Sequence, residues 1–97
     1  MADGPGALLA DARDCYAAGS VGEALRRCGA ALESSVADPD PRVVAEAATL
    51  VRRPVDPTLR ARAHQVAAQA LGLLLATGHG DSSEASRVRA QLEATED

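Results

Sequence analysis

The sequence predicts an all-α protein of about five helices arranged in antiparallel hairpins, either as a bundle or as a short solenoid. Three observations predict this class. Alanine, the best helix former and a poor strand former, occupies 22 of the 97 positions, while Ile, Phe and Trp are absent. Apolar residues recur at helical spacing, and segments open with helix-capping residues. The length favours a single domain over residues 1–97.

Residues 1–5 are expected to form a flexible start, and residues 6–36 the first hairpin. Its first helix buries a stripe of apolar residues and stops at Gly19. Ser20 and Glu23 have the spacing of a capping box for the second helix. The expected buried residues are Leu8, Leu9, Ala12, Cys15 and Tyr16, then Val21, Leu25, Cys28, Leu32 and Val36.

Two Asp-Pro pairs open the next helices, because Asp is a good N-cap and Pro suits the first helical position. Asp40-Pro41 predicts a short helix over 41–53, ended by Pro54. Asp56-Pro57 begins the second hairpin, 57–95. Its long helix has a stripe that ends at Leu74 and Leu75, and Asp81 is expected to cap the final helix.

Leu73 falls outside this stripe, so we expect it to meet a second neighbour or to belong to an exposed apolar patch near the last hairpin. Few large apolar residues must order all five helices. A partner, or a second copy in a homodimer, is therefore expected to complete the core. Small residues, namely Ala24, Ala31, Ala63, Ala67 and Ala70, are expected where helices touch.

The run from Leu8 to Leu32 resembles a tetratricopeptide repeat. Leu8 stands at the first large apolar position of that motif, Ala12 at its small position and Gly19 at the end of its first helix. Glu23-Ala24-Leu25 matches the start of its second helix. The closing Pro is misplaced, and the next 34 residues do not repeat the pattern. The resemblance implies a helical-repeat scaffold that binds a protein or a peptide.

The sequence shows few residues in an arrangement that would suit catalysis or the binding of a cofactor. His64 lies at the edge of a helical stripe without an evident partner, and His79 lies in a Gly-His-Gly turn. Cys15 and Cys28 lack zinc spacing and are expected to be reduced thiols. The resemblance to a tetratricopeptide repeat implies that they face each other across the first hairpin. We therefore expect a non-enzymatic protein without cofactor or metal.

Segment 41–65 carries five arginines against two acids, whereas the whole chain has a net charge of -4. The primary hypothesis is a regulatory or scaffold module for protein–protein interaction. Two alternatives are a nucleic-acid-associated regulator using this segment and a self-associating assembly domain. The overall acidity and the single aromatic residue make nucleic acid the weaker choice. The candidate partner-binding residues are Leu73, Arg52, Arg53, Arg60 and Arg62.

Cellular context follows from composition. The lack of Lys, Asn, Ile and Phe, whose codons are AT-rich, indicates a bacterial genome of high GC content. The longest apolar stretch, around 66–76, is too short to span a bilayer, and no secretion signal is evident. We therefore expect a cytoplasmic protein that does not bind membranes.

Overall fold

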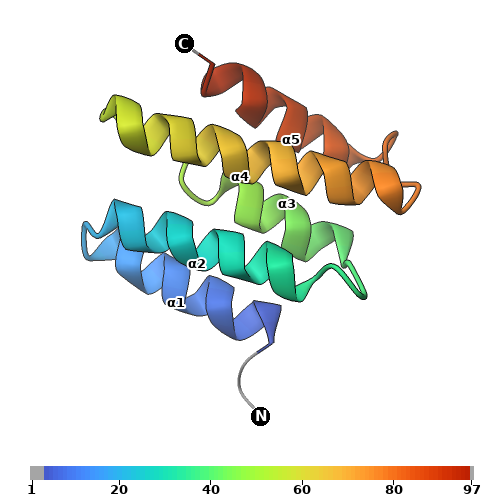
Figure 1. The fold of residues 1–97 in the computed structure, drawn as a ribbon, viewed down its shortest axis with the longest axis horizontal. Helices are drawn as coiled ribbons and strands as arrows, with labels where there is room; N and C mark the ends of the chain where they lie inside the picture. Colours follow the sequence, from blue (N-terminus) through green and yellow to red (C-terminus); the bar gives the residue numbers. More distant parts are fainter. Residues whose placement is uncertain (1–3, 97) are drawn as a thin grey trace.

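The computed structural model describes residues 4–96, and in this range it contains five helices and no strand. They are α1 (Pro5–Ala17), α2 (Val21–Ser34), α3 (Pro41–Thr49), α4 (Pro57–Ala76) and α5 (Ser83–Ala94) (Figure 1). The all-α prediction is confirmed. Helix α1 begins at Pro5, inside the predicted flexible start, because Pro fits the first helical position. Residues 1–3 of that predicted start lie outside the described part.

Each helix packs only against helices one or two places away along the chain. Helices α1, α3 and α5 form one layer, α2 and α4 form the other, and α3 contacts all four remaining helices. The helices succeed one another across the molecule, so α1 and α5 lie at opposite ends (Figure 1). The described helices thus form an open two-layer stack rather than a closed ring.

Small residues line the contacts between the helices. The main core gathers residues from all five helices, and a second cluster joins Ala24 and Leu25 of α2 to Val51 and Ala63. All five alanines predicted at helix contacts are at most 1% exposed. That prediction is confirmed. Close backbone approach at alanine compensates in part for the missing large aliphatic and aromatic residues.

Capping and turn residues next to the helices determine where most of them begin or end. The Asp40 side chain accepts a hydrogen bond from the Arg42 amide, and Asp56 accepts from the amides of Thr58 and Leu59. Gly19 and Gly78 adopt the left-handed conformation, with φ of +89° and +81°, directly after α1 and α4. Glycine adopts this conformation without steric cost, so both hairpins turn as the sequence predicts.

Two predicted caps are wrong. Ser20 makes no side-chain capping bond, and the Glu23 carboxylate is paired with arginines of its own helix. The last helix is capped by Ser82, whose hydroxyl accepts from the Ala85 amide, and not by Asp81. Ser82 also donates to the carbonyl oxygen of His79, 2.6 Å away, and this bond ties the cap to the preceding turn.

Helix α3 ends earlier than predicted, at Thr49 instead of near Arg53. Pro54 disfavours helical backbone at the residue before it, which accounts for the last part of the difference. The carbonyl groups of Val51 and Arg52 accept hydrogen bonds from the side chain of Gln91 on α5. These tertiary bonds replace the intrahelical bonds that a longer α3 would supply.

Three residues predicted to be buried are exposed. Tyr16, Val36 and Leu75 are 43%, 59% and 53% exposed. Tyr16 and Leu75 each stand three residues before a left-handed glycine, in the last turn of their helix. Val36 lies beyond the end of α2, in the connection to α3.

Leu73 is partly buried against the main core, because α4 contacts α2, α3 and α5 and therefore packs on more than one side. The expectation of a second neighbour is met. The expectation of an exposed patch centred on Leu73 is wrong.

Candidate partner-binding surface

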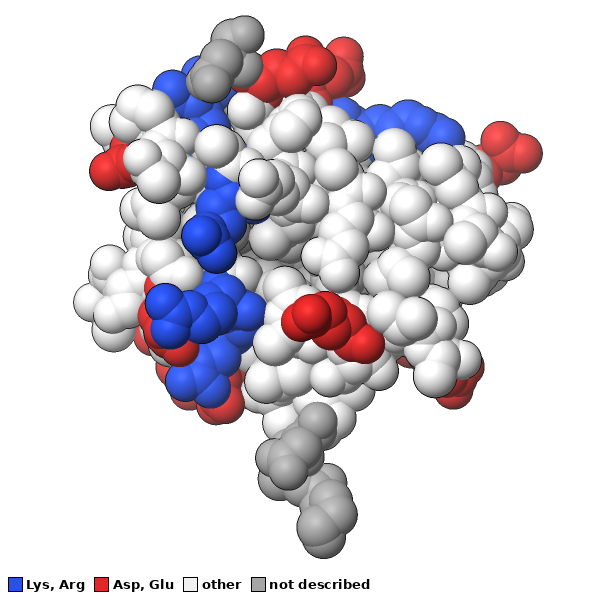
Figure 2. Space-filling view, viewed as in Figure 1, with Lys and Arg blue, Asp and Glu red and all other residues white. Residues whose placement is uncertain are grey.

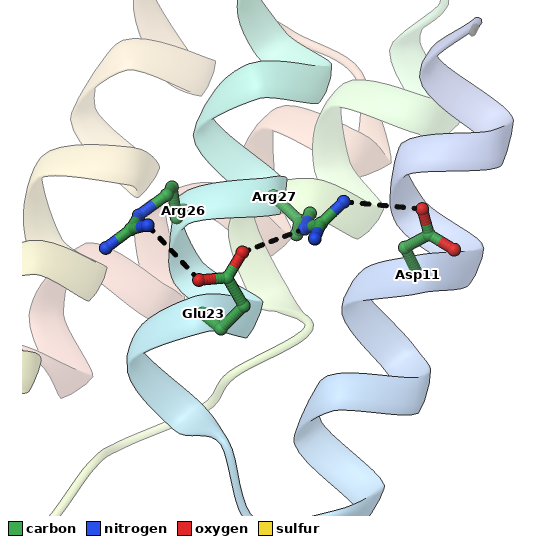
Figure 3. A network of polar contacts seen from close by, with 4 residues as sticks. All are labelled: Asp11, Glu23, Arg26 and Arg27. Atoms are coloured by element: carbon green, nitrogen blue, oxygen red, sulfur yellow. Dashed lines mark hydrogen bonds and ion pairs between the residues drawn. The ribbon is translucent and has the colours of Figure 1, made fainter.

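An ion-pair network joins the two helices of the first hairpin (Figure 3). The Arg27 Nε lies 3.0 Å from Glu23 Oε2, and its terminal nitrogen lies 3.5 Å from Asp11 Oδ2 on α1. Arg26 approaches the other oxygen of Glu23 at 3.3 Å. Because Arg26 and Asp11 are exposed and Glu23 and Arg27 are only half-buried, solvent screens these pairs and the network stabilises the hairpin only weakly. It also leaves both arginines paired, which makes them poor candidates for binding a ligand.

Two of the four arginines predicted to bind a partner have internal roles instead. Arg53 donates to the carbonyl oxygen of Ala94 in the last turn of α5. Arg60 donates to the carbonyl oxygens of Pro54 and Val55, at 3.4 and 3.3 Å, in the α3–α4 connection. A cation at a helix C-terminus is favourable for both charge and hydrogen bonding. These two side chains therefore hold the connection and the end of α5 in place.

The other two arginines, Arg52 and Arg62, lie in different layers. Arg52 borders a depression of about 420 Å³ that we call the α3–α5 hollow, lined by Thr49, Arg52, Arg87, Ala90, Gln91 and Ala94. Arg62 borders a depression of about 330 Å³ between α2 and α4, which we call the α2–α4 groove. The structure does not assemble Leu73 and the four predicted arginines into one site.

The α3–α5 hollow has the more one-sided charge. Arg52, in the connection after α3, and Arg87, on α5, both line it, together with the small apolar side chains of Ala90 and Ala94. No acidic residue lines the hollow. Within residues 4–96, neither the Arg52 side chain nor the Arg87 side chain has an ion-pair or hydrogen-bond partner. Two uncompensated guanidinium groups therefore border one concave surface.

The rim of this hollow is held by hydrogen bonds that do not involve Arg52 or Arg87 side chains. Gln91 is 4% exposed, and its Nε2 lies 2.8 Å from the Val51 carbonyl oxygen and also reaches that of Arg52. The Thr49 hydroxyl donates to the Ala45 carbonyl oxygen at 2.8 Å. The backbone around Arg52 is thus fixed, and its nearby carbonyl groups already have donors.

The α2–α4 groove differs in charge. Its lining includes Glu33 as well as Arg26 and Arg62, and Arg26 is already paired with Glu23. On the broad face shown in Figure 2, arginines gather mainly on the left, partly beside acids, and most of the surface is uncharged. This face therefore offers no continuous basic surface, and the α3–α5 hollow is the stronger candidate site for an anionic group.

The histidines form no catalytic arrangement in the described structure. His64 Nδ1 lies 3.0 Å from the Thr95 hydroxyl oxygen, and that hydroxyl donates to the Gln91 carbonyl oxygen at 2.8 Å. Since the hydroxyl has one proton, the His64 Nδ1–H is the donor between the two side chains. His64 is half-buried at the edge of the α4 stripe, as predicted. Its bond links α4 to the end of α5.

The two cysteines occupy different parts of the core. Cys28 is fully buried in the main core, and burial raises the pKa of its thiol to about 11. Cys15 is only partly buried and packs against the second cluster. Both are free thiols. In residues 4–96, no three His, Cys, Asp or Glu side chains gather closely enough to hold a metal ion.

Arg87 and Gln91 are the functional candidates that sequence reasoning missed. Gln91 stands three residues after Val88, and this spacing places it on the buried side of α5. A polar residue on an apolar stripe is a signal for a buried hydrogen bond. Arg87 precedes Gln91 by one helical turn and gives no comparable signal, because its importance depends on where α3 ends.

No protein-family model matches this chain, and neither the curated proteins nor the solved structures include a significant match to it. None of the described helices combines the length and hydropathy needed to cross a membrane. Evidence for the function therefore comes from the fold and from the α3–α5 hollow.

Proposed function

We propose that the protein is a non-enzymatic interaction module that binds a peptide or a partner protein at the α3–α5 hollow. The single observation that carries this proposal is the pair Arg52, in the α3–α4 connection, and Arg87, on α5, which border one small concave surface without a protein partner for either side chain among the described residues. The resemblance of the run from Leu8 to Leu32 to a tetratricopeptide repeat gives further support. We also propose a cytoplasmic location in a bacterial cell, and the two free thiols suit a reducing compartment.

The structure lends less support to the nucleic-acid alternative. Of the arginines in segment 41–65, Arg53 and Arg60 bind backbone carbonyls, and Arg52 and Arg62 lie in different layers. Phosphate groups along a nucleic acid are best met by a continuous basic surface. The self-association alternative is also less favoured, because the exposed large apolar side chains belong to four separate segments: Tyr16, Val36, Val55 and Leu75.

Photo-crosslinking in cells that express the protein tests the proposal. A photoreactive amino acid replaces Ala90 in the hollow in one variant and the exposed Ala68 of α4 in a control variant. We expect a discrete adduct with a protein from position 90 and none of the same mass from position 68. Equal adducts from both positions, or none from position 90, would contradict binding at the α3–α5 hollow.

A further inference from the structure

We infer that the occupant of the α3–α5 hollow is an acidic segment of a partner protein, with a Glu or Asp carboxylate held between Arg52 and Arg87. This inference rests on the proposed function and specifies the chemistry of its site. Hydrogen-bonding capacity, charge and shape at the hollow each favour this occupant.

Hydrogen-bonding capacity at the hollow is unbalanced. Each guanidinium group has five N–H donors and no acceptor. The carbonyl groups nearest to Arg52 already accept from Gln91, and that of Ala94 accepts from Arg53. Within residues 4–96, the Arg52 and Arg87 side chains have no hydrogen-bond or ion-pair partner. A carboxylate suits them, because its two oxygens match the planar fork of a guanidinium group.

Charge around the hollow favours a short acidic segment over a long polyanion. On α5, Glu84 and Glu93 stand three residues before Arg87 and three after Ala90. The chain as a whole is negative. A nucleic acid extending beyond the hollow would meet these like charges, and its bases would find no aromatic platform, because Tyr16 is the only aromatic residue. A short acidic segment extends less far beyond the hollow than a nucleic acid does, and it needs no aromatic platform.

Shape agrees with an occupant of this size. The hollow of about 420 Å³ falls at the lower end of the range typical of small-ligand sites, roughly 300–1,000 Å³. Two of the residues that line it on α5 are alanines, so a backbone or a short side chain can approach α5 closely there. Gln91 fixes the backbone at Arg52, and one side of the clamp is therefore positioned before a ligand arrives.

Titration of the isotope-labelled full chain with blocked hexaglutamate, monitored by NMR, tests the inference. Blocked hexaglutamine is the matched neutral probe, and a short oligothymidylate is the nucleic-acid probe. We expect hexaglutamate to shift the amides of Thr49, Arg52, Arg87 and Ala94, and hexaglutamine to shift none of them. The double variant Arg52→Gln/Arg87→Gln should bind hexaglutamate roughly fivefold more weakly or worse, as expected for exposed ion pairs. The control variant Arg62→Gln, in the other layer, should bind it like the parent.

Three results would overturn the inference: equal binding of hexaglutamine, undiminished hexaglutamate binding by the double variant, or tighter binding of oligothymidylate than of hexaglutamate. Unchanged thermal unfolding of the variants shows that loss of binding is not loss of fold. If hexaglutamate fails to bind while position 90 still crosslinks to a protein, the carboxylate inference fails and the proposed function stands. If hexaglutamate binds at the hollow but no crosslink forms in cells, the proposed function fails instead.

Discussion

The side-chain nitrogen of Gln91 lies 2.8 Å from the carbonyl oxygen of Val51, and this bond joins α5 to the residues that follow α3. The same nitrogen reaches the Arg52 carbonyl oxygen, so one buried amide satisfies two carbonyl groups outside a helix. This arrangement stops α3 early and turns the Arg52 backbone toward α5. The structural core and the candidate binding surface therefore share one residue.

Replacing Gln91 with Leu should destabilise the protein by about 1–3 kcal/mol, because two carbonyl groups lose their donor in a buried region. Urea unfolding measures the free-energy change. Gln69→Leu on the exposed face of α4 is the matched control and should change stability by less than about 0.5 kcal/mol. A Gln91→Leu variant as stable as the parent would show that the amide does not hold the end of α3.

Arg52 and Arg53 are adjacent in the chain, but their substitution should change the free energy of unfolding by different amounts. Arg53→Gln removes the bond to the Ala94 carbonyl oxygen, and we expect a loss of about 0.5–1 kcal/mol in unfolding free energy. Arg52→Gln removes a side chain that has no partner within the described residues, so it should leave stability within about 0.5 kcal/mol of the parent. Chemical denaturation of the two variants side by side checks this. A larger loss from Arg52→Gln than from Arg53→Gln would reverse the roles assigned to them.

Ala24 is fully buried between helices, so a larger side chain has no room there. Ala24→Leu should overpack the second cluster and cost about 1–3 kcal/mol. Ala10→Leu, at an exposed position of α1, is the control and should be nearly neutral. Thermal and urea unfolding provide the comparison. Equal stability of the two variants would mean that the packing of Ala24 in the second cluster is incorrect.

The buried thiol of Cys28 predicts a pH dependence of stability. Its pKa rises from 9.0 to about 11 on folding, so above pH 9 the unfolded chain releases this proton while the native protein retains it. The free energy of unfolding should therefore fall between pH 9 and pH 11, by roughly 2–3 kcal/mol from this group. Urea unfolding across this range should show a shallower fall for Cys28→Ala than for the parent. Identical slopes would indicate that the thiol is not desolvated.

Sequence patterns predicted the features that depend on single residues or on helical spacing. Asp40 and Asp56 cap helices as expected, and Gly19 and Gly78 adopt the left-handed conformation that ends a helix. Buried alanines such as Ala24 and Ala67 follow from the same periodicity. These features are local, so neighbouring residues suffice to determine them.

Sequence patterns did not predict the features that depend on tertiary packing. Leu73 and Leu75 differ by two positions, yet only contacts from three helices decide that Leu73 is covered and Leu75 is not. Likewise, the arginines of segment 41–65 form one group in the sequence. In the structure, however, Arg52 lines the α3–α5 hollow, whereas Arg53 donates to the carbonyl oxygen of Ala94. The pairing of Arg52 with Arg87 joins residues distant in the chain, and no local pattern predicts it.

The central prediction is that Arg52 and Arg87 are required for partner capture but not for folding. Crosslinking from position 90 should be repeated in Arg52→Gln/Arg87→Gln and in the control Arg62→Gln, with unfolding free energies measured for both. We predict that the double variant loses the adduct while its stability stays within about 0.5 kcal/mol of the parent, and that the control keeps the adduct. An adduct of undiminished yield in the stable double variant would contradict the assignment of the α3–α5 hollow as the binding site.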